Sequence, residues 1–281
     1  MSYQKEYRES IENPEAFWSR QAELINWYEK PKSILSQDEK GFYHWFKGGK
    51  LNTSYLALDF HVENGRAEQA ALIYDSPVTE SVRSYTYREL LDEVARFAGV
   101  LKNQGVEKGD RVIIYMPMIP EAVVAMLACA RLGAIHSVVF GGFAPNELAI
   151  RIDDAKPKAL VTASCGIEFT NIIEYKPLVD EALRISSHAP ETVILLQRSQ
   201  AKASIQAGRD FDWNDLMSSA NPVDPVPVDA TDPLYILYTS GTTGLPKGVI
   251  RENGGHAVAL KYSMKAIFNT NPGEVYWAGS D

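Results

Sequence analysis

From about residue 67 onward, short apolar runs alternate with segments in which apolar side chains recur every three or four residues. The first pattern is typical of buried strands and the second of amphipathic helices. Thr86 and Glu89 have the spacing of a capping box at the start of one helix, and Gly105 can close that helix. The predicted strands are residues 70–74, 111–116, 135–140, 159–163, 192–196 and a run from 234, and the predicted helices are 90–101, 120–130, 145–154 and 179–185.

This alternation predicts the fold class. Repeated strand–helix units place helices on both faces of a sheet, so we predict an α/β fold with a doubly wound, largely parallel sheet. Residues 198–230 are polar and rich in proline and aspartate, and we interpret them as a connecting excursion between two strands.

Residues 1–66 follow a different pattern, rich in aromatic side chains and without clear strand–helix alternation. Asn13 and Pro14 have the order of a helix cap and a first-turn proline, so we expect a short helix there. We interpret this segment as an N-terminal extension whose aromatic residues pack over the core domain at 67–281.

The composition narrows the function classes. The chain has 281 residues, a net charge of -8 and 45% hydrophobic residues, which indicates a globular protein and argues against broad binding to nucleic acid or anionic membranes. We find neither a bilayer-length apolar run nor a targeting segment, and the two cysteines do not have metal-site spacing, so we expect a reducing, cytoplasmic location and no metal site built from protein side chains.

The segment most indicative of a binding site begins where the apolar run 234–237 leads into a loop of hydroxyl-bearing residues, glycines and one lysine. Such a loop can offer backbone N–H groups, O–H groups and a mobile cation to phosphates. It is not a Walker loop, because Lys247 is followed by Gly248 rather than by Ser or Thr. A solvent-exposed turn is the alternative. The candidate phosphate-binding residues are Thr239, Ser240, Gly241, Thr242, Thr243, Gly244 and Lys247.

Residues 238–249 resemble the signature of the adenylate-forming (AMP-binding) superfamily. Further segments are similar to the short-chain acyl-CoA synthetase branch, and most similar to propionate–CoA ligases: they are residues 46–52, 115–118, 128–143 and 151–157. Essentially the whole chain is covered by this resemblance. Residues 1–66 then correspond to the N-terminal extension of these synthetases, and residues 67–281 to the first part of the AMP-binding domain.

The resemblance implies two half-reactions. A short carboxylate attacks the α-phosphate of Mg·ATP, which gives an acyl-adenylate and pyrophosphate, and the thiol of coenzyme A then displaces AMP. By motif position, Lys247 would be catalytic, and it would hold the β- and γ-phosphates together with the hydroxyls and glycines of the loop. The cofactors implied are ATP, Mg²⁺ and coenzyme A.

The segment Phe140, Gly141 and Gly142 matches a family segment that lies against coenzyme A. On sequence alone, a tight strand-to-helix turn explains the two glycines equally well. Arg151, on the helix that follows, reads either as a ligand-facing residue or as a solvated or ion-paired helix arginine. His256 reads as a packing or surface histidine, with a catalytic base as the alternative.

One stretch departs from the pattern of related acetyl-CoA synthetases, which carry two arginines for coenzyme A phosphate. Here Glu168 and Asn171 stand at those positions, and a carboxylate facing a phosphate is unfavourable. We therefore expect the phosphate to be held differently, and Lys176 is the substitute that the sequence offers.

The resemblance covers only the N-terminal portion of the family, whose members run to more than twice this length. We expect the C-terminal domain to be absent and the 281 residues alone to be inactive. The acyl pocket would lie beyond Asp281, so the choice between propionate and acetate stays open. Two alternatives are a carrier-protein-loading adenylation domain and a non-catalytic nucleotide-binding fragment; we expect small-molecule substrates only, and the sequence does not predict an oligomeric state.

Overall fold

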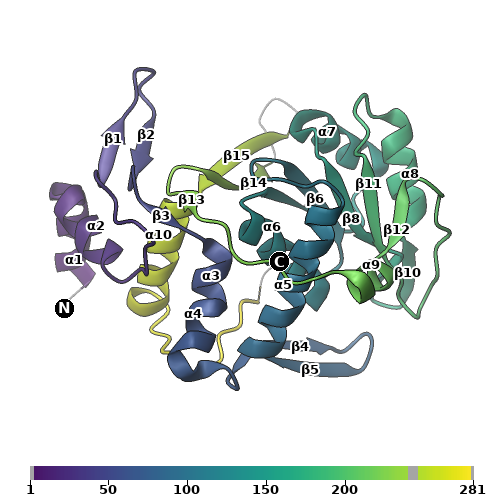
Figure 1. The fold of residues 1–281 in the computed structure, drawn as a ribbon, viewed down its shortest axis with the longest axis horizontal. Helices are drawn as coiled ribbons and strands as arrows, with labels where there is room; N and C mark the ends of the chain where they lie inside the picture. The colour runs from purple at the N-terminus through teal and green to yellow at the C-terminus, as the bar shows by residue number, and fades with distance from the viewer. Residues whose placement is uncertain (1–2, 240–245, 280–281) are drawn as a thin grey trace.

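The computed structural model describes residues 3–239 and 246–279. At its centre lies a seven-stranded sheet with the order β12-β11-β8-β6-β7-β14-β15 (Figure 1). All neighbouring pairs are parallel except β14 and β15, which are antiparallel. The strands are β6 (Arg111–Met116), β7 (Ile135–Phe140), β8 (Ala159–Ala163), β11 (Thr192–Leu196), β12 (Asp210–Asp212), β14 (Pro233–Thr239) and β15 (Lys247–Glu252).

Helices cover both faces of this sheet, which confirms the predicted doubly wound α/β fold. Alternate residues of β6 belong to two separate core clusters, because successive side chains of a strand point to opposite faces. Val112 and Ile114 pack with one group of helices, and Ile113 and Tyr115 with the other. The first group is α5 (Tyr87–Asn103), α6 (Pro120–Leu132) and α9 (Trp213–Ser219); the second is α7 (Pro145–Ala155) and α8 (Tyr175–Ile185).

The sequence signals at the helix ends are confirmed. Thr86 Oγ1 accepts a hydrogen bond from the Glu89 N–H, and the Glu89 carboxylate accepts from the Thr86 N–H, which completes the capping box of α5. α6 begins with Pro120 in its first turn and ends at Gly133, whose φ of 71° is left-handed. Asn13 occupies the cap position of α2 (Pro14–Ala22), although its side chain makes no capping hydrogen bond.

The strand predicted at 70–74 is β4 (Ala70–Ser76), but it lies outside the main sheet, in a hairpin with β5 (Ser81–Thr86). The sequence did not predict β5, nor a second hairpin outside the main sheet, formed by β9 (Cys165–Glu168) and β10 (Asn171–Glu174). The excursion at 198–230 contains β12, α9 and β13 (Val228–Asp229). β5, β10 and β12 each lack the long apolar run that marks a buried strand, so the pattern of apolar residues alone could not identify them.

The N-terminal region contains α1 (Tyr3–Glu12), α2, β1 (Leu35–Gln37), β2 (Tyr43–Trp45), β3 (Lys50–Leu51), α3 (Thr53–Ala57), α4 (Asp59–His61) and a wide turn, η1 (Val62–Arg66). In Figure 1 the β1–β2 hairpin projects away from the main sheet. A third core cluster joins this region to α10 (Asn253–Ala266), and Phe17 packs edge-on against Tyr262 at 5.3 Å. Part of the aromatic set therefore packs as predicted, whereas Tyr28, Phe42 and Tyr43 are exposed. Among the described residues no helix combines the length and apolar character that a membrane span needs.

Candidate functional site

A cavity of about 990 Å³ opens at the carboxyl ends of β6, β7 and β14. This is the edge of a parallel sheet where ligands bind in open α/β folds. The predicted residues Phe140, Gly141 and Gly142 line it. Other lining residues come from the hairpin β9–β10, from the start of α8 and from the end of β11. The cavity thus joins elements that are far apart in the sequence.

The two glycines after β7 have different roles. A Cβ on Gly141 would lie 2.5 Å from the Tyr175 hydroxyl and 2.7 Å from the Met116 carbonyl oxygen, so packing requires glycine there. Gly142 has a φ of +100°, which an L side chain rarely adopts, and open space lies where its Cβ would be. Its N–H donates to the Tyr115 hydroxyl at 3.1 Å. The turn interpretation therefore holds for both residues. Gly142 also leaves room for a ligand to approach the backbone closely.

Arg151 forms one wall of the cavity and is held by the protein. Its Nη1 donates to the Glu147 carboxylate at 2.8 Å and to the Glu147 carbonyl oxygen at 2.6 Å. The guanidinium lies 5.1 Å from the Phe143 ring centroid and 5.5 Å from that of Tyr238. The ion-paired interpretation of Arg151 is confirmed, although its side chain is buried rather than solvated.

The glycine-rich loop connects two antiparallel strands. Thr239 ends β14 and stands opposite Lys247, the first residue of β15, and both are exposed. The Tyr238 hydroxyl donates to the Asp154 carboxylate at 2.6 Å, which links the end of β14 to α7. Burial is the main cause that raises the Tyr238 pKa, and the Asp154 carboxylate raises it further. Ser240, Gly241, Thr242, Thr243 and Gly244 lie outside the described residues. Their assignment, and that of Lys247, stays a prediction.

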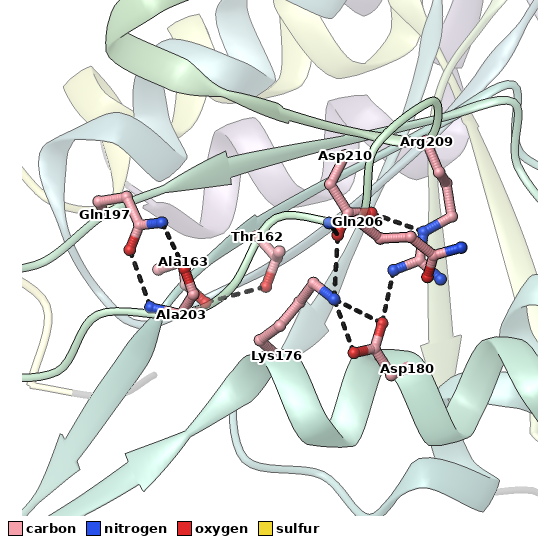
Figure 2. Close-up of polar contacts among 9 residues, drawn as sticks. All are labelled: Thr162, Ala163, Lys176, Asp180, Gln197, Ala203, Gln206, Arg209 and Asp210. Carbon is pink, nitrogen blue, oxygen red and sulfur yellow. Dashed lines mark hydrogen bonds and ion pairs between the residues drawn. The ribbon is translucent and has the colours of Figure 1, made fainter.

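Lys176 is not the phosphate-binding substitute that the sequence suggested. Its Nζ lies 2.6 Å from Asp180 and 2.9 Å from Asp210, and its side chain is only 4% exposed. Arg209 completes the cluster by contacting both carboxylates (Figure 2). The Lys176 ammonium is thus paired with two carboxylates inside the protein, and the expectation that it binds a phosphate was wrong.

The stretch that departs from the family pattern forms the hairpin β9–β10. Glu168 and Asn171 pair with each other at its end, and Glu168 lines the cavity. Sequence reasoning missed two other lining residues, Tyr175 and Arg198. Arg198 follows β11 by two residues. Its position after the carboxyl end of a predicted strand is the only sequence signal that could have indicated a ligand-facing residue.

His256 packs edge-on against Tyr235, with ring centroids 5.3 Å apart, as the packing interpretation expects. Burial lowers its pKa, and Arg251 lowers it further. His136 is nearby, and burial lowers its pKa to about 4. Neither histidine belongs to a metal-ligand cluster, since residues 3–239 and 246–279 contain no group of three or more His, Cys, Asp or Glu that could hold a metal ion.

Known families match almost the whole chain. A model described as AMP-binding enzyme matches residues 60–281, and one described as acetyl-coenzyme A synthetase N-terminus matches residues 3–57. An uncharacterized protein of Pseudomonas aeruginosa is 58% identical over 281 residues, which are all of this chain and 45% of that protein.

Two named relatives are also similar. The acyl-CoA synthetase short-chain family member 3, mitochondrial, of Mus musculus is 52% identical over 99% of this chain and 41% of its own length. The acetyl-coenzyme A synthetase 2 of P. aeruginosa is 44% identical over 99% of this chain and 43% of its own length. The chain thus spans about two fifths of the curated relatives it matches.

Among solved structures, an acetoacetyl-CoA synthetase from Streptomyces lividans superposes with a TM-score of 0.87 and 28% identity. The match covers 97% of this chain and 41% of that protein. It agrees with the mixed α/β architecture described above.

Proposed function

The chain belongs to the AMP-binding enzyme family, and we propose that the protein containing it activates a short-chain carboxylate with ATP and transfers the acyl group to coenzyme A. Its named relatives are short-chain acyl-CoA and acetyl-coenzyme A synthetases. The observation that carries the proposal is the cavity lined by the end of β14 and by the Gly141–Gly142 turn, at the carboxyl ends of parallel strands.

In the first half-reaction, a carboxylate oxygen attacks the α-phosphorus of ATP and the bond to the departing pyrophosphate breaks. The chain contributes hydroxyls and one cation at the β14–β15 loop, because charge must be neutralised as the pyrophosphate leaves. Lys247 would supply that cation, and Thr239 stands opposite it in the hairpin. Mg²⁺ would accompany ATP rather than occupy a site built from protein side chains.

In the second half-reaction, the thiol sulfur loses its proton to solvent and attacks the acyl carbon, and AMP leaves with the bonding electron pair. Phe140, Gly141 and Gly142 would lie against the coenzyme. The open space at Gly142 supports this assignment, since a ligand can approach the backbone there without meeting a side chain.

Propionate is the acyl substrate that we propose, with acetate as the alternative. The test is ATP–pyrophosphate exchange by the full-length protein with acetate, propionate and butyrate at equal concentration. We expect the highest kcat/KM with propionate. Exchange with none of the three acids would refute carboxylate activation, and a clear preference for acetate would correct the substrate alone.

Lys247→Ala tests the loop in the same assay. We expect adenylation to fall by roughly 10²–10³-fold, the loss seen when one preorganised charge-stabilising donor is removed. Lys261→Ala is the matched control, because Lys261 is an exposed lysine on α10 away from the cavity. Normal exchange by Lys247→Ala would remove this residue from the mechanism.

The similarity to the acetyl-coenzyme A synthetase N-terminus at residues 3–57 favours coenzyme A over a carrier protein as the acyl acceptor. Because the chain spans about two fifths of its relatives, we propose that the 281 residues alone form no acyl-adenylate. Exchange activity by the isolated chain would contradict this.

A further inference from the structure

Arg198 is a cavity-lining arginine that is anchored at one side only. Its backbone N–H donates to Ser164 Oγ at 2.8 Å, and its Nη1 donates to the Cys165 carbonyl oxygen at 3.0 Å. Among the described residues, no carboxylate lies within 4 Å of the Arg198 guanidinium. Arg151 and Arg209, by contrast, each have a carboxylate partner. A guanidinium has five N–H donors, so most of its hydrogen-bonding capacity remains for a ligand.

Tyr175 lies at the floor of the same cavity. Its hydroxyl fits between Gly141 and Gly166: a Cβ on Gly141 would lie 2.5 Å from that oxygen, and one on Gly166 only 2.3 Å away. Glycine at both positions therefore leaves the space that this hydroxyl occupies, and Tyr175 lines the cavity.

The surroundings keep the Tyr175 hydroxyl protonated. The pKa of Tyr175 is raised to about 12, mainly by burial and further by Tyr115, whereas the positive charge of Arg198 lowers it. At neutral pH the hydroxyl is thus a hydrogen-bond donor.

We propose that Arg198 binds a phosphate group of the thiol substrate, with the Tyr175 hydroxyl as a second donor at the cavity floor. The inference rests on the proposed function, which supplies coenzyme A as the substrate. A planar guanidinium binds phosphate through paired N–H donors, and a neutral phenol adds a donor without adding charge. Arg198 then fulfils the role for which the sequence suggested Lys176.

The nearby charges decide which arginine is available. Arg151 faces the same cavity, but Glu147 neutralises it and two aromatic rings flank it. Glu168 also lines the cavity, and its carboxylate opposes an anion. A phosphate in this cavity therefore needs a cation that has no carboxylate partner, and Arg198 is the lining arginine without one in the part of the chain that the structure describes.

The test compares full-length wild type, Arg198→Gln and Arg198→Lys. For Arg198→Gln we expect the KM for coenzyme A to rise about tenfold or more, since a hydrogen bond to a charged group contributes about 1.5–3 kcal/mol. ATP–pyrophosphate exchange should be unchanged, because it precedes thiol binding. Arg198→Lys should recover part of the loss, since it restores the charge but not the fork. Arg184→Gln is the control, an exposed arginine paired with Glu181 on α8.

Dephospho-coenzyme A identifies the phosphate. If Arg198 binds the 3′-phosphate, wild type should prefer coenzyme A over the dephospho form, and Arg198→Gln should lose that preference. If it binds the diphosphate, the KM should rise equally for both thiols. Either result supports the proposal.

Two outcomes would overturn the proposal. One is a KM for coenzyme A within twofold of wild type, and the other is a parallel fall in exchange activity, which would indicate a structural role. If wild type forms no acyl-CoA, the proposed function fails instead. Calorimetric titration of wild type and Arg198→Gln with coenzyme A then decides the role of Arg198 by itself.

Discussion

Two groups of charged residues differ in how their charges are compensated: one is centred on α8, and the other lines the cavity. In the first, which we call the α8 ion cluster, Lys176 and Arg209 each contact Asp180 and Asp210 (Figure 2). In the second, the cavity wall, Arg198 and Glu168 line a cavity without an ion pair between them in the described part of the chain.

The difference separates structural charge from charge that is available to a ligand. A buried ion is costly unless its partners compensate it, and the α8 ion cluster provides two carboxylates for two cations. The Asp210 side chain has no exposed surface, and it also accepts a hydrogen bond from the Gln206 N–H at 2.9 Å. A partly compensated arginine on a cavity wall keeps N–H donors that an anion can bind in place of water.

The largest effect that we predict is on the α8 ion cluster. Asp210→Asn leaves Lys176 and Arg209 with Asp180 alone, so the free energy of unfolding should fall by about 3–5 kcal/mol, as when one partner of a buried pair is removed. Denaturant unfolding of the full-length protein measures the loss. Asp180→Asn is the matched control: Asp180 contacts the same two cations but is 42% exposed, so its loss should be under about 1 kcal/mol. Equal losses would show that burial does not distinguish these carboxylates.

Acid should remove part of the same stabilisation. Burial raises the Asp210 pKa, but hydrogen bonds from Arg209, Gln206 and Lys176 outweigh burial, so the net shift is downward. A lowered pKa stabilises the fold above the unfolded-state value of about 3.9, and that contribution is lost as the pH falls through the folded-state value. The gap in unfolding free energy between wild type and Asp210→Asn should therefore be constant from pH 7 to 5 and narrow below about pH 4. A gap that widens on acidification would contradict the assigned direction.

A smaller effect is expected at the cavity floor. In Gly166→Ala the new Cβ would lie 2.3 Å from the Tyr175 hydroxyl and 2.6 Å from its Cζ, so the ring must shift, at a cost of about 1–3 kcal/mol. We expect a lower melting temperature and a higher KM for coenzyme A in the full-length protein. Gly255→Ala is the control, because its Cβ would meet only Trp45 at 3.9 Å. An unchanged KM would mean that the position of Tyr175 does not matter for the ligand.

The contrast between the two charged groups also explains what the sequence could reveal. The core strands β6, β7, β8 and β11 and the capping box of α5 were predicted correctly, since buried apolar runs and capping residues act locally. Lys176 and Arg198 could not be told apart in this way. Lys176 lies four residues from Asp180, but its decisive partner, Asp210, comes from the excursion at 198–230, in which no strand was predicted. Partners so distant in sequence leave no periodic signal.

The smallest predicted effect concerns Glu168, the carboxylate of the cavity wall. Glu168→Gln removes an exposed negative charge that opposes a bound phosphate, so the KM for coenzyme A should fall about two- to threefold, consistent with 0.2–1 kcal/mol for an exposed charge pair. Since salt screens exposed charges, the gain should shrink at about 1 M ionic strength. Glu174→Gln is the matched control, because it removes an exposed carboxylate from the other end of the same hairpin, outside the cavity lining. Equal changes in KM for both variants would indicate that only overall charge matters, whereas a fall confined to Glu168→Gln would place the phosphate beside the β9–β10 hairpin.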